Sequence, residues 1–273
     1  MDASREIDLM GIVNLTDNSY FPASRCLGDD GNPDIEKALG VASAHIAAGA
    51  TIIDVGACST RPGSDPVGEE EEWRRLKAFL PELRAAFPHV RISVDTYFAS
   101  VVRNVHGLVG DFIVNDISAG EDDPQMLETV GKLGLTYIAM HKRGTPKTMQ
   151  SLTEYGDVCR DIHEYFEEFA AKARRYGIKD WILDPGFGFA KTVGQNYELM
   201  RGLAGFADLG RRILVGVSRK SMIYKKFGIT PEEALPATQA LHMAALCAGA
   251  DILRVHDVAP ARQTIEIYRE LYA

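Results

Sequence analysis

The chain has 273 residues, 46% of them hydrophobic and 25% charged, which is an ordinary globular mixture at a length that single α/β barrels commonly reach. This composition excludes a disordered chain, a collagen and a bundle of membrane helices. The net charge of −8 argues against non-specific nucleic-acid binding, but a few local Arg and Lys residues can still hold a small anionic ligand.

Short apolar runs rich in β-branched residues alternate with longer segments of helical period. The runs predict strands at 7–13, 51–55, 91–94, 112–114, 136–140, 181–183, 213–217 and 252–255. The segments between and after them predict helices at 35–49, 70–86, 98–108, 124–133, 156–176, 195–209, 231–248 and 260–271. Eight alternating units pair in parallel and close into a (β/α)8 TIM barrel, an α/β fold.

No linker or low-complexity run divides the chain, so we expect residues 1–273 to form one domain. An open doubly wound sheet is the rival fold, but it would carry a G-x-G-x-x-G after the first strand, where this sequence reads Gly11-Ile12-Val13-Asn14. The N-terminus lacks the layout of a signal peptide, and the four cysteines form no C-x-x-C pair. We therefore expect a cytoplasmic protein with neither a membrane nor a nucleic-acid partner.

Every predicted strand ends in polar residues. In chain order these are Asn14, Asp54, Asp95, Asn115 with Asp116, His141, Asp184, Ser218 to Lys220, and Arg254 with His256. Any one of them could cap a helix or a turn, and we expect Asp54 and Asp116 to satisfy loop amides. Because a barrel gathers its C-terminal strand ends on one face, the full set predicts a ligand site there.

This ring of residues combines two chemistries. Asp95, Asn115 and Asp184 can hold a planar heterocycle, because carboxylates accept N–H donors in the ring plane and an amide both donates and accepts. Cationic and imidazole donors suited to phosphate oxygens stand at the other positions, namely Arg61, Lys220, Arg254 and His256. We infer a ligand that is a heterocycle carrying a phosphate or diphosphate.

Segments along nearly the whole chain match those of a known family in order. They are MGIVNLT at 10–16, IDVG at 53–56, STRPG at 59–63, SVDTY at 93–97, NDIS at 115–118, MHKRGTP at 140–146, DPGFGF at 184–189, GVSRKS at 216–221 and RVHDV at 254–258. With these motifs the chain resembles the dihydropteroate synthases of folate biosynthesis. The resemblance implies that 6-hydroxymethyl-7,8-dihydropterin diphosphate and 4-aminobenzoate condense to 7,8-dihydropteroate and diphosphate, by a dissociative mechanism with Mg2+ as cofactor. It also implies a homodimer.

The resemblance assigns a role to individual positions. Residues implied to hold the pterin are Asp95, Asn115, Asp184 and Lys220, with Ile117, Met140, Phe189 and Gly216 lining the pocket. Residues implied to hold the diphosphate are Asn14, Arg61, Arg254 and His256, and Asn14 is also implied as a ligand of Mg2+. Residues implied to shape the 4-aminobenzoate pocket are Thr60, Pro62, Phe189 and Ser221. Those expected to act on the reacting groups are Asp95, Asp184, Lys220, Arg254, His256 and Asp17.

Two loops depart from the family pattern. The first loop has Asp17 one place earlier than the usual acid, with Asn18 in the acid's place, and we hypothesise that Asp17 supports the pterin cation instead. The second loop has Cys58 where Glu is usual, and we interpret this thiol as a bystander because the reaction needs no protein nucleophile. The first loop also resembles that of sulfonamide-insensitive members, so drug insensitivity stays open. Two alternative functions are a pterin-dependent methyltransferase and a non-catalytic pterin-binding homologue.

Overall fold

The computed structural model describes residues 5–16, 26–28, 30–58, 67–145 and 147–272. Four residues singled out in the sequence lie outside these ranges, namely Asp17, Thr60, Arg61 and Pro62. Their predicted roles therefore stay predictions.

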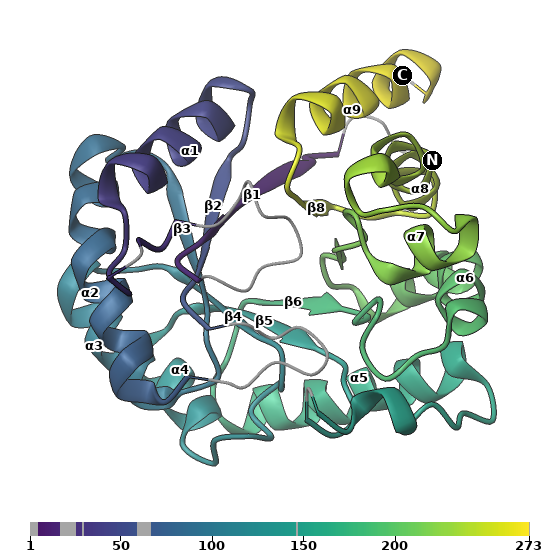
Figure 1. The fold of residues 1–273 in the computed structure, drawn as a ribbon. Helices are drawn as coiled ribbons and strands as arrows, with labels where there is room; N and C mark the ends of the chain where they lie inside the picture. The colour runs from purple at the N-terminus through teal and green to yellow at the C-terminus, as the bar shows by residue number, and fades with distance from the viewer. Residues whose placement is uncertain (1–4, 17–25, 29, 59–66, 146, 273) are drawn as a thin grey trace.

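Eight parallel strands form the centre of the molecule (Figure 1). They are β1 (Asp8–Asn14), β2 (Ile52–Gly56), β3 (Arg91–Asp95), β4 (Ile113–Asp116), β5 (Thr136–Met140), β6 (Trp181–Asp184), β7 (Leu214–Val215) and β8 (Ile252–Val255). Their order in the sheet is β6-β5-β4-β3-β2-β1-β8-β7, and a parallel bridge between Leu183 and Ile213 joins β6 to β7. The sheet is thus a nearly closed ring, and the prediction of a (β/α)8 barrel is confirmed.

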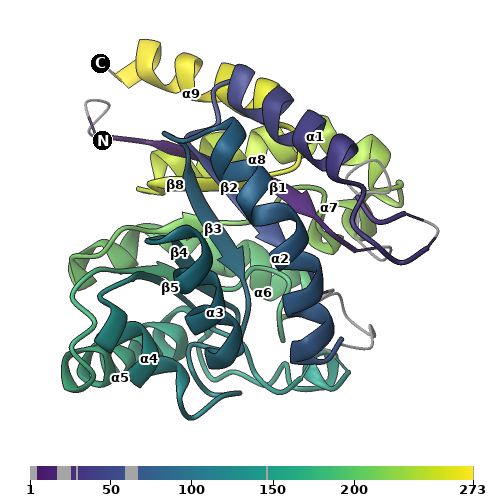
Figure 2. The same ribbon diagram turned by 90° about the vertical axis from the view of Figure 1, so that its left-hand side faces the viewer.

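Helices surround the ring of strands, as the two perpendicular views show (Figures 1 and 2). The α-helices of the described residues are α1 (Ile35–Ala47), α2 (Glu69–Ala86), α3 (Ala99–Val109), α4 (Met126–Leu133), α5 (Val158–Arg175), α6 (Val193–Gly202), α7 (Ser221–Phe227), α8 (Leu235–Cys247) and α9 (Val258–Tyr272). Short 3-10 helices are η2 (Met149–Ser151), η3 (Leu203–Leu209) and η4 (Glu232–Ala234). No helix in this part of the chain is both long and apolar enough to cross a membrane.

The helices differ from the sequence prediction at three places. The predicted helix 195–209 divides into α6 and η3 at Gly202, where any Cβ would meet the Cys159 sulfur. The predicted helix 231–248 begins as η4 before it continues as α8. The sequence analysis missed α7 as a separate helix, because seven residues between Lys220 and the left-handed Gly228 are too few to show a helical period.

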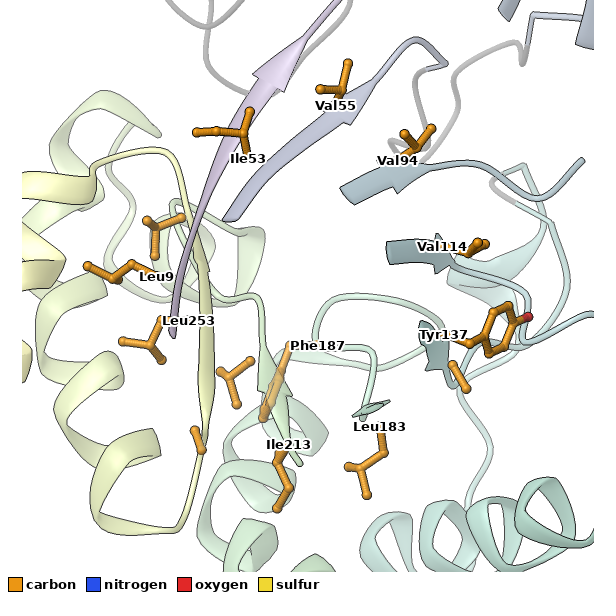
Figure 3. Close-up of a cluster of buried hydrophobic side chains, with 14 of the residues drawn as sticks. Leu9, Ile53, Val55, Val94, Val114, Tyr137, Leu183, Phe187, Ile213 and Leu253 are labelled. Carbon is orange, nitrogen blue, oxygen red and sulfur yellow. The ribbon is translucent and has the colours of Figure 1, made fainter. Parts of the chain in front are cut away.

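Side chains alternate between the two faces of each strand, and this separates two apolar layers. Outward-facing residues pack under the helices, as the labelled Leu9, Ile53, Val94 and Val114 do in Figure 3. Inward-facing residues form a second cluster inside the barrel, consisting of Met10, Ile52, Ile113, Ile138, Ile182, Leu214 and Ile252. The interior is therefore a packed floor, and the next inward residue of each strand lies above it on the side of the strand ends.

An ionic cluster around the buried Asp8 lies at the opposite, N-terminal end of the barrel. The Asp8 carboxylate accepts hydrogen bonds from Thr51 Oγ1 at 2.7 Å and Arg212 Nη2 at 2.8 Å, and it also pairs with Arg91. Burial alone would raise the pKa of Asp8, but these donors outweigh it and the pKa is lowered. This end of the barrel supports the structure, while the site lies at the other end.

Candidate functional site

A buried network of charged and amide side chains lies directly above the apolar floor. The Asp54 carboxylate accepts hydrogen bonds from Ser93 Oγ at 2.6 Å, Asn115 Nδ2 at 3.3 Å and Arg254 Nε at 2.7 Å. Arg254 also donates through Nη2 to Asp95 Oδ2 at 3.0 Å. Four strands contribute to this network, so two residues far apart in sequence, Asp54 and Arg254, form an ion pair inside the barrel.

Strand register explains the network. Asp54 pairs with Ser93 across β2 and β3, and Asp95 pairs with Asn115 across β3 and β4, so all four side chains point inward at neighbouring heights. The expectation that Asp54 satisfies loop amides is therefore wrong: its partners are side chains of the interior.

Asp116 behaves as the sequence predicted. It follows Asn115 directly, so alternation turns its side chain to the outer face of β4. Its carboxylate accepts from the backbone N–H groups of Ser118 at 2.7 Å and Gly120 at 2.8 Å, and from Tyr137 Oη at 2.6 Å. Asp116 thus shapes the loop after β4 from behind the site.

The loop after β6 brings the second carboxylate and a lysine together. Asp184 Oδ1 accepts from the Gly186 N–H at 2.8 Å, which fixes the rotation of this carboxylate. Lys220 Nζ donates to the Phe187 carbonyl oxygen at 2.7 Å and lies 5.0 Å from the centre of the Phe189 ring. Asp184 and Phe189 of the DPGFGF motif therefore lie at one place with Lys220 of the GVSRKS motif.

Burial moves the titration of these groups toward neutral pH. It raises the pKa of Asp95 to about 7, although Arg254 opposes the change. It also raises the pKa of Asp184, opposed by Lys220. Burial lowers the pKa of Lys220 to about 8, with Asp184 opposing. Because Asp95 and Lys220 titrate near the working pH of an ordinary enzyme, both can change charge when a ligand enters.

An apolar wall stands beside the charged network. Ile117, Met140 and Phe189, all three predicted to line the ligand pocket, form one cluster with Met149 and Ala190, and Tyr97 packs against it. The sequence analysis did not assign Met149 or Tyr97. Met149 belongs to the short η2 and carries no motif, whereas Tyr97 stands inside the SVDTY motif and could have been inferred from it.

Glycine leaves room at the end of β7. A Cβ on Gly216 would lie 3.7 Å from Lys220 Nζ and 3.9 Å from Arg254 Cβ. Any larger side chain there would reach into the space between these two cations. Gly216 is thus placed between a predicted pterin residue and a predicted diphosphate residue.

The anion side of the site contains an imidazole that is not a cation. His256 Nδ1 lies 3.1 Å from Ser218 Oγ, and its backbone N–H donates to the same hydroxyl at 3.3 Å. Burial, followed by the charge of Arg254, lowers the pKa of His256 to about 3. His256 therefore offers a neutral hydrogen-bonding group at pH 7, and the positive potential of the described site comes from Arg254 and Lys220.

Two further residues, Asn14 and Cys58, lie at or shortly after the ends of β1 and β2. Asn14 ends β1 opposite Gly56, and a Cβ on that glycine would lie 3.6 Å from Asn14 Oδ1 and 3.7 Å from Asp95 Cβ. The Cys58 thiol is buried and lies 4.0 Å from Tyr97 Oη. Burial, aided by the charge of Glu72, raises the pKa of Cys58 to about 11, which keeps the thiol protonated and agrees with a bystander role.

The fold and the site together define a class of pterin-binding barrel enzymes. A sequence model of the family described as "Pterin binding enzyme" matches residues 10–256, a range that includes every strand from β1 to β8 except the first two residues of β1.

Known proteins narrow this class. The chain is 40% identical over 267 residues to the dihydropteroate synthase of Escherichia coli K12, covering 97% of this chain and 90% of that protein. The crystal structure of Yersinia pestis dihydropteroate synthase with a sulfonamide drug superposes with a TM-score of 0.91 at 34% identity, covering 99% of this chain and 96% of the other. Xanthomonas albilineans dihydropteroate synthase with 4-aminobenzoic acid gives 0.88 at 32% identity, covering 99% and 94%. The chain belongs to the dihydropteroate synthase family.

Proposed function

We propose that this protein joins 4-aminobenzoate to the methylene carbon of 6-hydroxymethyl-7,8-dihydropterin diphosphate in folate biosynthesis. The observation that carries the proposal is the array of the buried Asp95, Asn115 and Asp184 with the partly buried Lys220, beside an apolar wall. Carboxylates and an amide match the N–H groups of a pterin edge, and the wall matches its flat faces. The similar synthases favour this reaction over the methyltransferase and the non-catalytic homologue.

The reaction replaces a C–O bond of the methylene carbon with a C–N bond. The methylene C–O bond breaks with its electron pair going to diphosphate, and the amine nitrogen of 4-aminobenzoate then bonds to the methylene carbon and releases a proton. Asp95 and Asp184 stabilise the positive charge that develops on the pterin, because their carboxylates are fixed by Arg254 and the Gly186 N–H. Lys220 and Arg254 stabilise the charge that moves onto the leaving group.

Asn14 is the residue that the family resemblance implies as a ligand of Mg2+. The described residues contain no cluster of three or more His, Cys, Asp or Glu side chains that could hold a metal. Mg2+ often binds through one or two protein oxygens and the phosphates of its substrate, and Asn14 Oδ1 at the end of β1 fits that mode. The ion would neutralise diphosphate charge when bound, so we expect chelation to lower turnover and added Mg2+ to restore it.

We further propose that the protein works as a homodimer in the cytoplasm. The family resemblance of the sequence implies the dimer. Light scattering on the purified protein measures the mass directly: twice 30.0 kDa supports the dimer, and 30.0 kDa contradicts it.

The test of the function is product formation. The purified protein, supplied with the pterin diphosphate, 4-aminobenzoate and Mg2+, should release dihydropteroate and diphosphate in equal amounts. Lys220→Ala and Asp184→Ala should each abolish product formation. Lys225→Ala should not, because Lys225 is an exposed lysine of α7, the helix that follows Lys220. Full turnover in the Lys220 and Asp184 variants would refute the assignment.

A further inference from the structure

A second buried lysine lies behind the loop that carries Asp184 and Phe189. Lys191 Nζ donates to the carbonyl oxygens of Gly186 at 2.8 Å and Phe189 at 3.0 Å, and it lies 3.1 Å from His141 Nδ1. Lys191 and His141 are each only 3% exposed. The amine therefore binds two loop carbonyls and lies beside one imidazole, and no carboxylate of the described residues forms an ion pair with it.

The backbone of this loop depends on that arrangement. Gly186 has a φ of 72°, a conformation that favours glycine, and a Cβ at this position would collide with the His141 carbonyl oxygen. The loop is thus packed directly on the end of β5. Without the Lys191 amine, the carbonyls of Gly186 and Phe189 would each lose a buried hydrogen-bond donor.

The Phe187 carbonyl, which lies between those of Gly186 and Phe189 in the chain, binds Lys220. Phe187 O accepts the hydrogen bond from Lys220 Nζ at 2.7 Å, and the Phe189 ring lies 5.0 Å from the same nitrogen. The Gly186 N–H orients the Asp184 carboxylate. The contacts of Lys220 with Phe187 and Phe189, and that of Asp184 with Gly186, therefore lie on the same short loop. Lys191 binds this loop at the carbonyls of Gly186 and Phe189.

We propose that Lys191, with His141 as its partner, is a positioning residue for the pterin site. Its amine fixes the loop 184–190, and the loop in turn sets the position of the Lys220 ammonium and the rotation of the Asp184 carboxylate. The inference rests on the proposed function, because it assumes that these two groups contact the pterin. In this role Lys191 and His141 act through the loop, with no contact to the substrate required of either.

The chemistry of the amine agrees with a geometric role. Burial lowers the pKa of Lys191 well below its usual range, with Asp184 opposing, and burial followed by the charge of Lys191 lowers that of His141. An amine offers N–H donors in several directions, which match the two carbonyls, and the imidazole lies beside the same nitrogen.

The test compares two buried lysines of neighbouring loops. Lys191→Met removes the amine but keeps the length of the side chain. The matched control is Lys142→Met, because Lys142 is 5% exposed and binds Asp122 and the Gly144 carbonyl, with no hydrogen bond to the loop 184–190. We expect Lys191→Met to lower kcat/KM for the pterin diphosphate at least about tenfold, since small misplacements of a catalytic group are that costly. The control should change it less than about threefold.

The pH profile provides a readout that general loss of stability does not move. In Lys191→Met the Phe187 carbonyl no longer holds Lys220 in place, so the alkaline limb of kcat/KM should move to lower pH. It should not move in Lys142→Met. If Lys191→Met fails to fold, His141→Leu and His141→Asn provide the test instead. Only Asn keeps a polar atom near the Nδ1 position, so His141→Leu should lower kcat/KM and His141→Asn should restore it.

The two possible failures are distinguishable. Wild-type protein that makes no dihydropteroate overturns the proposed function. Active wild-type protein whose Lys191→Met variant matches Lys142→Met in both kcat/KM and pH profile, or whose two His141 variants behave alike, overturns the positioning role.

Discussion

Glu72 lies in the first turn of α2 with its side chain fully inside the protein. The residue is 0% exposed. Burial raises the pKa of Glu72 to about 8 from an ordinary value of 4.5, although a hydrogen bond from Thr96 opposes the change, and the charge of Asp95 adds to it. Glu72 is therefore a protonated, neutral acid at neutral pH.

Replacing Glu72 with Gln should change the pH dependence of stability. The folded protein keeps the Glu72 proton up to about pH 8, while the unfolded chain loses it near pH 4.5. A group with a raised folded pKa stabilises fully below the unfolded value, and this contribution is lost as pH rises toward the folded value. At about 1.4 kcal/mol per pH unit, the wild type should lose about 3 kcal/mol from this group between pH ~5 and pH ~7.5. Gln does not titrate, so Glu72→Gln should not show that loss.

Urea unfolding at both pH values, followed by tryptophan fluorescence, measures the difference. The stability of Glu72→Gln minus that of the wild type should rise by about 3 kcal/mol from the lower pH to the higher one. Other groups, including Asp95, contribute to both proteins and cancel to a first approximation. Glu70→Gln, an exposed carboxyl of the same helix turn, is the control and should give a flat difference. A flat difference for Glu72→Gln as well would show that the buried carboxyl is ionised in the folded protein and refute the reasoning.

Three further results are expected. The kcat/KM of the wild type should fall below about pH 7, where Asp95 gains a proton and cannot support the pterin cation, and above about pH 8, where Lys220 loses its charge; a profile flat from pH ~6 to ~9 would contradict both assignments. Tyr137→Phe removes the hydroxyl that donates to Asp116 and should cost about 1–3 kcal/mol in urea unfolding while the protein still turns over; an unchanged stability would argue against that bond. Asp17→Ala should lower turnover if Asp17 supports the cation, and the same coupled assay with a sulfonamide measures whether the altered first loop confers insensitivity; unchanged turnover would remove Asp17 from the site.

The barrel could be predicted because its pattern is repeated eight times. Each strand is a short apolar run and each is followed by a segment of helical period, so errors at individual boundaries do not change the fold. The short α7 escaped because its seven residues give too few turns for periodicity, and the division at Gly202 depends on the contact with Cys159, which is distant in the sequence.

The site was only partly predictable. The alternation of side chains along a strand predicts which strand residues point inward, but it does not predict contacts between loops. Counting residues in steps of two separates Asp116 from Asn115 and places Asp54 in phase with Gly56 at the strand end, so the inward position of Asp54 could have been inferred. The contacts of Met149 and Lys191 could not, because they join loops whose relative positions no local pattern specifies.

The arrangement of Arg254 reconciles a net charge of −8 with an anionic substrate. Arg254 gives Nε to Asp54 and Nη2 to Asp95, and these two carboxylates outweigh burial, which alone would lower its pKa, so the pKa is raised. A guanidinium has five N–H groups, and those on Nη1 are not used by either carboxylate. Arg254 can therefore bind a diphosphate while it still holds Asp95 in place. On the proposed function one cation would contact both the leaving group and Asp95, so the Asp54 and Asp95 carboxylates keep that cation charged and oriented instead of repelling the anion.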